Sequence, residues 1–144
     1  MKKLLYVCFA FFAIQVGFAQ ASPEAKAYIK NLKMKESLDQ TKVGITNLIL
    51  NENLEKFNTE FDNLINTFIA DFENLVNENY TAEDLNKLNK SIESNSAPEP
   101  IAPKDAVAFQ EKANKIQEEM GMSLQGIVMK YGDPVKLEEM EKEQ

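Results

Sequence analysis

The sequence predicts an all-α protein, a single compact bundle of five to six helices behind a cleaved signal peptide. Apolar residues recur every three or four positions over most of the 144-residue chain, which is the period of an amphipathic helix. No stretch of useful length alternates apolar and polar residues, as a half-buried strand would. The first 19 residues have the composition of a secretory signal. Together these three observations predict the fold class.

The amino-terminal segment is typical of an export signal. A positive start, Met1-Lys2-Lys3, precedes an unbroken apolar run from Leu4 to Ile14. Gly17 and Ala19 are the small residues that a signal peptidase requires at the third and first positions before its cut, so we expect cleavage after Ala19. The apolar run is shorter than the about 20 residues of a membrane span and is interrupted by Gln15, which favours a cleaved signal over an uncleaved anchor.

Composition excludes several kinds of chemistry from the mature chain. There is no histidine, arginine or tryptophan, and the only cysteine, Cys8, lies inside the predicted signal. Histidine-based proton transfer, cysteine catalysis, thiolate metal sites and disulfides are therefore excluded. The net charge is −7, and it becomes −9 when Lys2 and Lys3 leave with the signal. Such an acidic protein repels phosphate backbones and anionic lipid surfaces, so we expect no nucleic-acid partner.

Two helices are expected at the start of the mature chain, and the first follows Ser22. Serine is a preferred N-cap and proline a preferred first helical residue, so a helix is expected from Pro23. Its apolar pattern slips around Met34 to Ser37, which predicts a turn or kink. A second helix is expected over Ser37 to Leu50, although the interior Gly44 costs about 1 kcal/mol relative to alanine.

Residues 52–78 carry the clearest helical pattern in the chain. Their apolar residues are separated by gaps of one, three or four positions and form a wide stripe on one face. Burying such a stripe contributes about 15–30 kcal/mol before the cost of ordering the chain, so we expect this helix to be the central packing element. The stripe consists of Leu54, Phe57, Phe61, Leu64, Ile65, Phe68, Ile69, Phe72, Leu75 and Val76.

Two further helical regions are expected after this stripe. Thr81 and Asp84 have the spacing of a shortened capping box, which predicts a helix start that continues to Ile92. Another helix is expected from Lys104 or Asp105, with Gly121 as its C-cap. A last apolar stripe follows, and Gly132-Asp133-Pro134 ends it. That stripe consists of Leu124, Ile127, Val128 and Tyr131.

These elements predict a simple domain organisation. Residues 1–19 are the signal peptide, and residues 20–134 form one helical domain. Three prolines make residues 94–104 an extended loop inside that domain, because proline cannot continue a helix. Residues 135–144 are mostly glutamate and lysine, and we expect a charged tail that forms a frayed helix.

The aromatic residues of the central stripe are the candidate binding residues. A row of large apolar side chains could line a groove for a lipid or a peptide, but such a row is more often part of the core. Both interpretations stay open at this point. The candidate surface consists of Phe57, Phe61, Phe68 and Phe72.

No segment predicts catalysis, a cofactor or a metal. Residues 51–62 have the alternating acidic and amide groups of a calcium loop, but Lys56 stands where that loop requires glycine. Runs such as Glu118-Glu119 are typical of solvated helix faces. We therefore predict no catalytic residue, no cofactor and no metal site.

Three segments carry a family resemblance. Residues 28–40 (Tyr-Ile-Lys-Asn-Leu-Lys-Met-Lys-Glu-Ser-Leu-Asp-Gln), the phenylalanine-rich helix and residues 80–85 (Tyr-Thr-Ala-Glu-Asp-Leu) resemble a bacterial exported family. It is the domain-of-unknown-function family numbered twenty fifty-nine. The resemblance covers residues 25–130 and implies a small helical domain behind a signal peptide, without an established activity. Ser91-Ile92 replaces that family's usual Phe-Tyr pair, and a Pro-rich loop replaces its Pro-x-Gly turn.

The sequence favours a non-enzymatic binding or interaction module that is exported to the periplasm or secreted, and that uses an apolar helical surface. Its partner would be a protein or a lipid of the cell envelope. The alternative is a small-ligand or lipid carrier, or an enzyme, with a carboxylate–tyrosine pocket, since carboxylates are plentiful and the chain has four tyrosines. After signal cleavage we expect no transmembrane segment.

Overall fold

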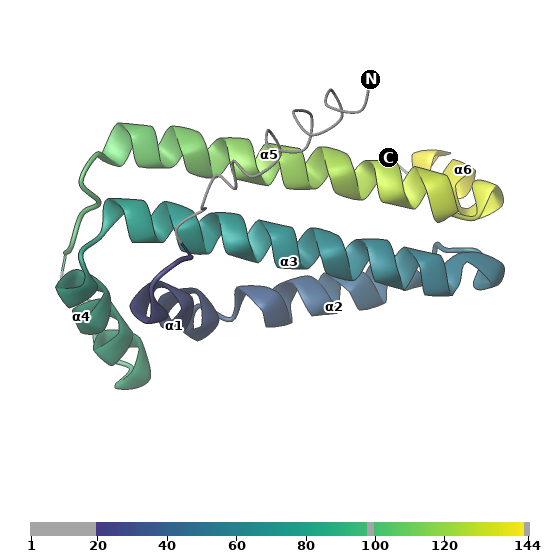
Figure 1. The fold of residues 1–144 in the computed structure, drawn as a ribbon. Coiled ribbons are helices and arrows are strands. Elements are labelled where there is room, and N and C mark those ends of the chain that lie inside the picture. The colour runs from purple at the N-terminus through teal and green to yellow at the C-terminus, as the bar shows by residue number, and fades with distance from the viewer. Residues whose placement is uncertain (1–19, 98–99, 143–144) are drawn as a thin grey trace, which may run out of the picture.

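The computed structural model describes residues 20–97 and 100–142, and within these residues the protein is all-α, as predicted (Figure 1). The predicted signal peptide lies outside the described residues. None of the helices in the described part of the chain combines the length and the apolar character that a membrane crossing needs.

The described residues form six α-helices and one short 3-10 turn. The helical content agrees with the expectation of five to six helices. The elements are α1 (Pro23–Asn31), α2 (Met34–Thr46), η1 (Asn51–Asn53), α3 (Leu54–Asn79), α4 (Ala82–Glu93), α5 (Ala106–Tyr131) and α6 (Pro134–Lys142).

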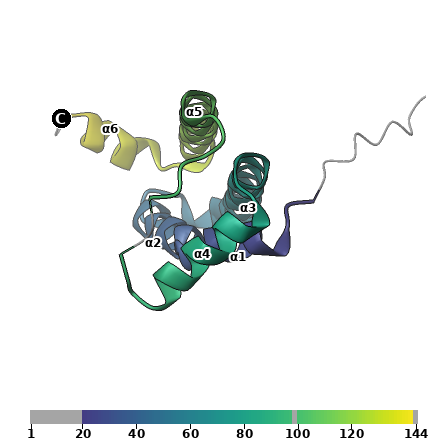
Figure 2. The same ribbon diagram turned by 90° about the vertical axis from the view of Figure 1, so that its left-hand side faces the viewer.

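Helix α3 is the central element, as its apolar stripe predicts. It packs against α5 more extensively than any other two elements pack together, and α1 and α2 cover another side of it (Figures 1 and 2). Helix α4 packs mainly against α1. The largest fully buried side chains are Phe57, Phe61, Ile65 and Leu85, so α3 supplies most of the deep core.

Local sequence signals set the starts of α1 and α4. The Ser22 hydroxyl accepts a hydrogen bond from the amide of Ala25 at 3.2 Å. At α4 the amide of Asp84 donates to the Thr81 hydroxyl at 3.2 Å, and the Asp84 carboxylate accepts from the Thr81 amide at 3.3 Å. The predicted capping box is therefore confirmed.

Helix α2 ends earlier than the sequence predicts. We expected it to reach Leu50, but it stops at Thr46 because the next residues pair with another part of the chain. Ile49 and Gly132 form an antiparallel bridge. The Leu50 amide donates to the Tyr131 carbonyl at 3.2 Å. These backbone contacts join the segment after α2 to the end of α5.

Helix α5 is longer than the sequence predicts. Gly121 does not cap it, and one helix runs from Ala106 to Tyr131. The reason is that apolar residues on both sides of Gly121, such as Met120 and Leu124, continue the same face toward the core. Packing against α3 therefore outweighs the weak helix propensity of glycine.

Candidate functional site

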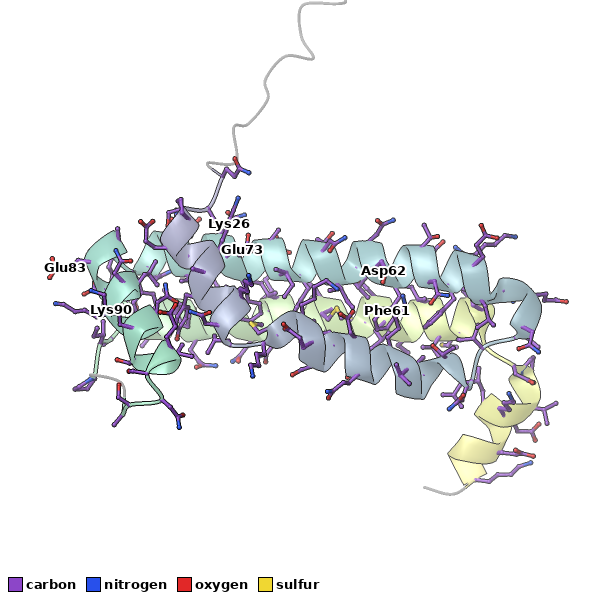
Figure 3. The ribbon with its side chains drawn as sticks, turned by 90° about the horizontal axis from the view of Figure 1, so that it is seen from below. Lys26, Phe61, Asp62, Glu73, Glu83 and Lys90 are labelled. Atoms are coloured by element: carbon purple, nitrogen blue, oxygen red, sulfur yellow. The ribbon has the colours of Figure 1, made fainter. Side chains whose placement is uncertain are left out.

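The four phenylalanines predicted as a binding surface lie in the core. Phe57 and Phe61 are 0 % exposed, and Phe68 and Phe72 are 9 % exposed. The rings of Phe57 and Phe61 pack together with centroids 5.4 Å apart, and Figure 3 shows Phe61 between the helices. Phe68 and Phe72 form a second tilted pair at 4.9 Å. In this arrangement the stripe holds the helices together instead of facing solvent.

The exposed large apolar residues lie elsewhere and are spread over several elements. Their exposure ranges from 45 % to 71 %, and they do not follow the phenylalanine stripe. Single exposed apolar side chains are normal on protein surfaces. They are Leu32, Val43, Val107, Met122, Met129 and Val135.

A groove runs along the seam between α3 and α5, and we call it the α3–α5 groove. It has a volume of about 530 Å³. Buried Leu75 and half-buried Ile116 form its apolar floor, and charged residues of both helices form its rims. A smaller hollow of about 140 Å³ adjoins it, shares Asp71, Ile116 and Glu119, and includes Phe68. Of the four predicted phenylalanines, Phe68 lines this smaller hollow and none lines the groove itself.

One ion pair bridges the two rims of this groove, and a second lies along the α5 rim. The Lys112 ammonium of α5 lies 2.9 Å from the Glu78 carboxylate of α3. The Lys115 ammonium lies 3.7 Å from the Glu119 carboxylate on the same helix. All four side chains are at least half exposed, so these pairs position the rims but contribute little to stability.

Asp71 occupies the point where the two hollows meet. Asp71 is an exposed residue, but partial desolvation by the groove walls raises its pKa above the usual range, and the nearby Glu119 carboxylate raises it further. The groove therefore has one carboxylate whose charge is disfavoured in the free protein. A cationic group that entered the groove would relieve this cost.

A carboxylate–tyrosine pair does exist, but at the opposite end of the α3–α5 seam. The buried Tyr131 hydroxyl donates to Glu60 Oε1 at 2.6 Å, and Lys130 Nζ lies 2.6 Å from the same oxygen. Lys130 and, second, Tyr131 lower the pKa of Glu60. A carboxylate with a lowered pKa stays ionised near neutral pH, so Glu60 is not suited to act as a general acid. The pair instead links α5 to α3.

Metal ligation finds no support in the described part of the chain. Among residues 20–97 and 100–142, no three carboxylates are placed to hold an ion. The segment that resembles a calcium loop forms η1 and the first turns of α3.

Sequence patterns did not indicate the groove. Glu119 was expected to belong to a solvated run of charges, and no role was predicted for Asp71, which lies on another helix. Only the register between α3 and α5 brings them together. The apolar pattern of one helix does not determine how that helix is aligned along its neighbour.

Comparison with known protein families, with curated proteins and with solved structures gave no match for this chain. The resemblance described from the sequence therefore stays a prediction.

Proposed function

We propose that the protein is a non-enzymatic interaction module that binds a basic amphipathic helix of a partner protein in the α3–α5 groove. The observation that carries this proposal is the groove itself, with an apolar floor at Leu75 and Ile116 between charged rims. Helix-in-groove recognition uses this arrangement, because apolar anchors enter the floor while polar residues meet the rims.

The shape of the seam supports a helical occupant. Helices α3 and α5 lie side by side over most of their lengths (Figure 1). A third helix laid over this seam would contact both of them, which is the ordinary geometry of helix packing. The lining residues of the groove and of the adjoining smaller hollow together run from Leu64 to Glu78 on α3, which corresponds to about 20 Å at about 1.5 Å per residue.

Charge supports a basic occupant. The whole chain carries a net charge of −7, and the pKa of Asp71 in the groove is raised by partial desolvation and by the nearby Glu119 carboxylate. A lysine or arginine of the partner placed near Asp71 would lower that cost and would accelerate association. An anionic lipid surface would be repelled for the same reason.

We also propose that this binding takes place outside the cytoplasm, in the periplasm or the medium. The positive start, the apolar run and the small residues before position 20 support export. Intact-mass measurement of protein recovered outside the cytoplasm tests this. A mass that lacks residues 1–19 is expected, and a mass that retains them contradicts cleavage.

The binding test uses a synthetic amphipathic peptide of leucine and lysine, about 14 residues or four turns long. We expect Glu119→Lys to weaken binding about tenfold, because it places a positive charge at the groove rim. The matched control is Glu118→Lys, which makes the same charge change at an exposed neighbour that does not line the groove. Equal losses for both variants would show a nonspecific charge effect and would contradict the proposal.

The second candidate is a carrier for a small ligand or lipid. The volume of about 530 Å³ lies within the range of small-molecule sites, about 300–1,000 Å³. Native mass spectrometry of the protein recovered from its source separates the candidates. A co-purifying polypeptide is expected, whereas a bound small molecule or lipid would favour the carrier.

A further inference from the structure

The second half of α2 combines little burial with residues that form helices poorly. Helix α2 has no buried residue along its whole length. Residues 41–46 read Thr-Lys-Val-Gly-Ile-Thr, so four of six are β-branched and one is Gly44. Both residue classes are poor helix formers, and β-branched residues favour strands. The intrinsic preference of this segment for the helix is therefore low.

Few contacts hold this half of α2 in place. Lys42 Nζ pairs with Asp62 of α3 at 2.7 Å and lies 5.8 Å from the centre of the Phe61 ring. Ile45 is half-buried against the core, while Val43 is 70 % exposed. Elements with so little buried apolar surface open locally at a lower free energy than the whole protein.

The same segment begins an uncharged run that is typical of strand-forming sequences. Residues 43–50 read Val-Gly-Ile-Thr-Asn-Leu-Ile-Leu and contain no charge and no proline. Runs of this length that combine high β-propensity with low charge pair readily with copies of themselves. Charged residues bound the run, with Lys42 before it and Glu52 shortly after it.

The end of this run is already extended. Ile49 forms an antiparallel bridge with Gly132, and the Asp133 amide donates to the Leu48 carbonyl at 2.7 Å. If residues 43–47 left the helix, they would continue an existing extended segment. Only one half-helix would have to open, because the bridge holds its far end and α1 holds its near end.

We propose that residues 43–50 are a self-association segment, which opens from α2 and pairs as an antiparallel strand with the same segment of a second copy of this chain. A second copy is the occupant because this run carries no charge, so pairing it with its own copy places no like charges opposite each other. When a twofold axis relates two identical strands of one sheet, the strands run antiparallel. This proposal is independent of the α3–α5 groove.

The experiment follows the assembly of the purified protein at rising concentration, just below its unfolding temperature. Sedimentation gives the mass, and the amide I infrared band reports strand formation. Gly44→Ala is the first variant, because a Cβ at Gly44 meets nothing within 4 Å and alanine favours the helix. We expect about fivefold slower assembly, which corresponds to the helix preference of alanine over glycine. Gly126→Ala on α5 is the matched control, since a Cβ there also meets nothing within 4 Å.

A second pair of variants tests the strand itself. Val43→Lys places a charge within the run, and Val107→Lys makes the same change at an equally exposed site on α5, at 69 % against 70 % exposure. We expect Val43→Lys to slow assembly at least as much as Gly44→Ala, while Val107→Lys assembles like the parent protein. The inference is overturned if both lysine variants behave alike, or if the parent protein stays monomeric and helical at every concentration.

Discussion

The Tyr131 hydroxyl donates a 2.6 Å hydrogen bond to Glu60 Oε1, and this bond joins the end of α5 to the first half of α3. The ammonium of Lys130 shares the same oxygen and lies 4.7 Å from the centre of the Tyr131 ring. Both donors lower the pKa of the carboxyl group. The bond closes the seam whose other end holds the α3–α5 groove.

The first prediction concerns this bond. Tyr131→Phe removes one of the two donors, so the pKa of Glu60 should rise toward its usual range while Lys130 still keeps it lowered. A lowered folded-state pKa contributes stability above the unfolded pKa, and that stability is lost as pH falls through the folded value. The stability deficit of Tyr131→Phe should therefore be larger at pH 7 than at pH 3. Carboxyl-detected NMR titration measures the pKa, and an unchanged value would contradict the role of the hydroxyl.

The second prediction tests whether the phenylalanine stripe is core. Phe61 is fully buried against Phe57, so Phe61→Ala should lower the free energy of unfolding by about 3–5 kcal/mol. Thr59→Ala, at an exposed position of the same helix, should change it by less than about 0.5 kcal/mol. Urea unfolding measures both values. A loss below about 1 kcal/mol for Phe61→Ala would mean that the ring is not part of the packed core.

The third prediction contrasts two glycines near the end of α5. A Cβ at Gly132 would lie 2.6 Å from the Val128 carbonyl oxygen and 2.7 Å from Leu137 Cδ1. Gly132→Ala should therefore cost about 1–3 kcal/mol, because a backbone oxygen cannot easily move away. Gly126→Ala should instead stabilise the protein by up to about 1 kcal/mol, since its Cβ meets nothing. Equal effects of the two substitutions in chemical denaturation would contradict the described packing of α6 on this turn.

The fourth prediction concerns pH and the groove. Desolvation raises the pKa of Asp71 in the folded protein. The ionised carboxylate therefore lowers the free energy of unfolding at pH values above the folded pKa. This destabilisation is absent at pH values below the unfolded pKa, where the group is protonated in both states. Asp71→Asn should raise the melting temperature at pH 7 but make no difference at pH 3. Melting curves at the two pH values test this. A variant that is less stable than the parent protein at pH 7 would show that the carboxylate has a stabilising partner.

Local chemistry allowed much of the fold to be predicted from the sequence. The pair Thr81 and Asp84 marked the start of α4, because both halves of a capping box lie within four residues. The stripe of α3 predicted both its length and its central place. The residues at which α2 and α5 end were harder to predict, because the bridge between Ile49 and Gly132 joins residues far apart in sequence.

The sequence by itself determined that this protein is helical, that α3 lies at its centre and that the chain has no histidine and a single thiol, Cys8. Periodicity, caps and composition are local properties, so they can be seen one helix at a time. The tertiary structure decided that the phenylalanines are buried, that α5 passes through Gly121, and that Asp71 and Glu119 share a groove. Each of these depends on which helix faces meet, and that choice is made by packing between segments distant in the chain.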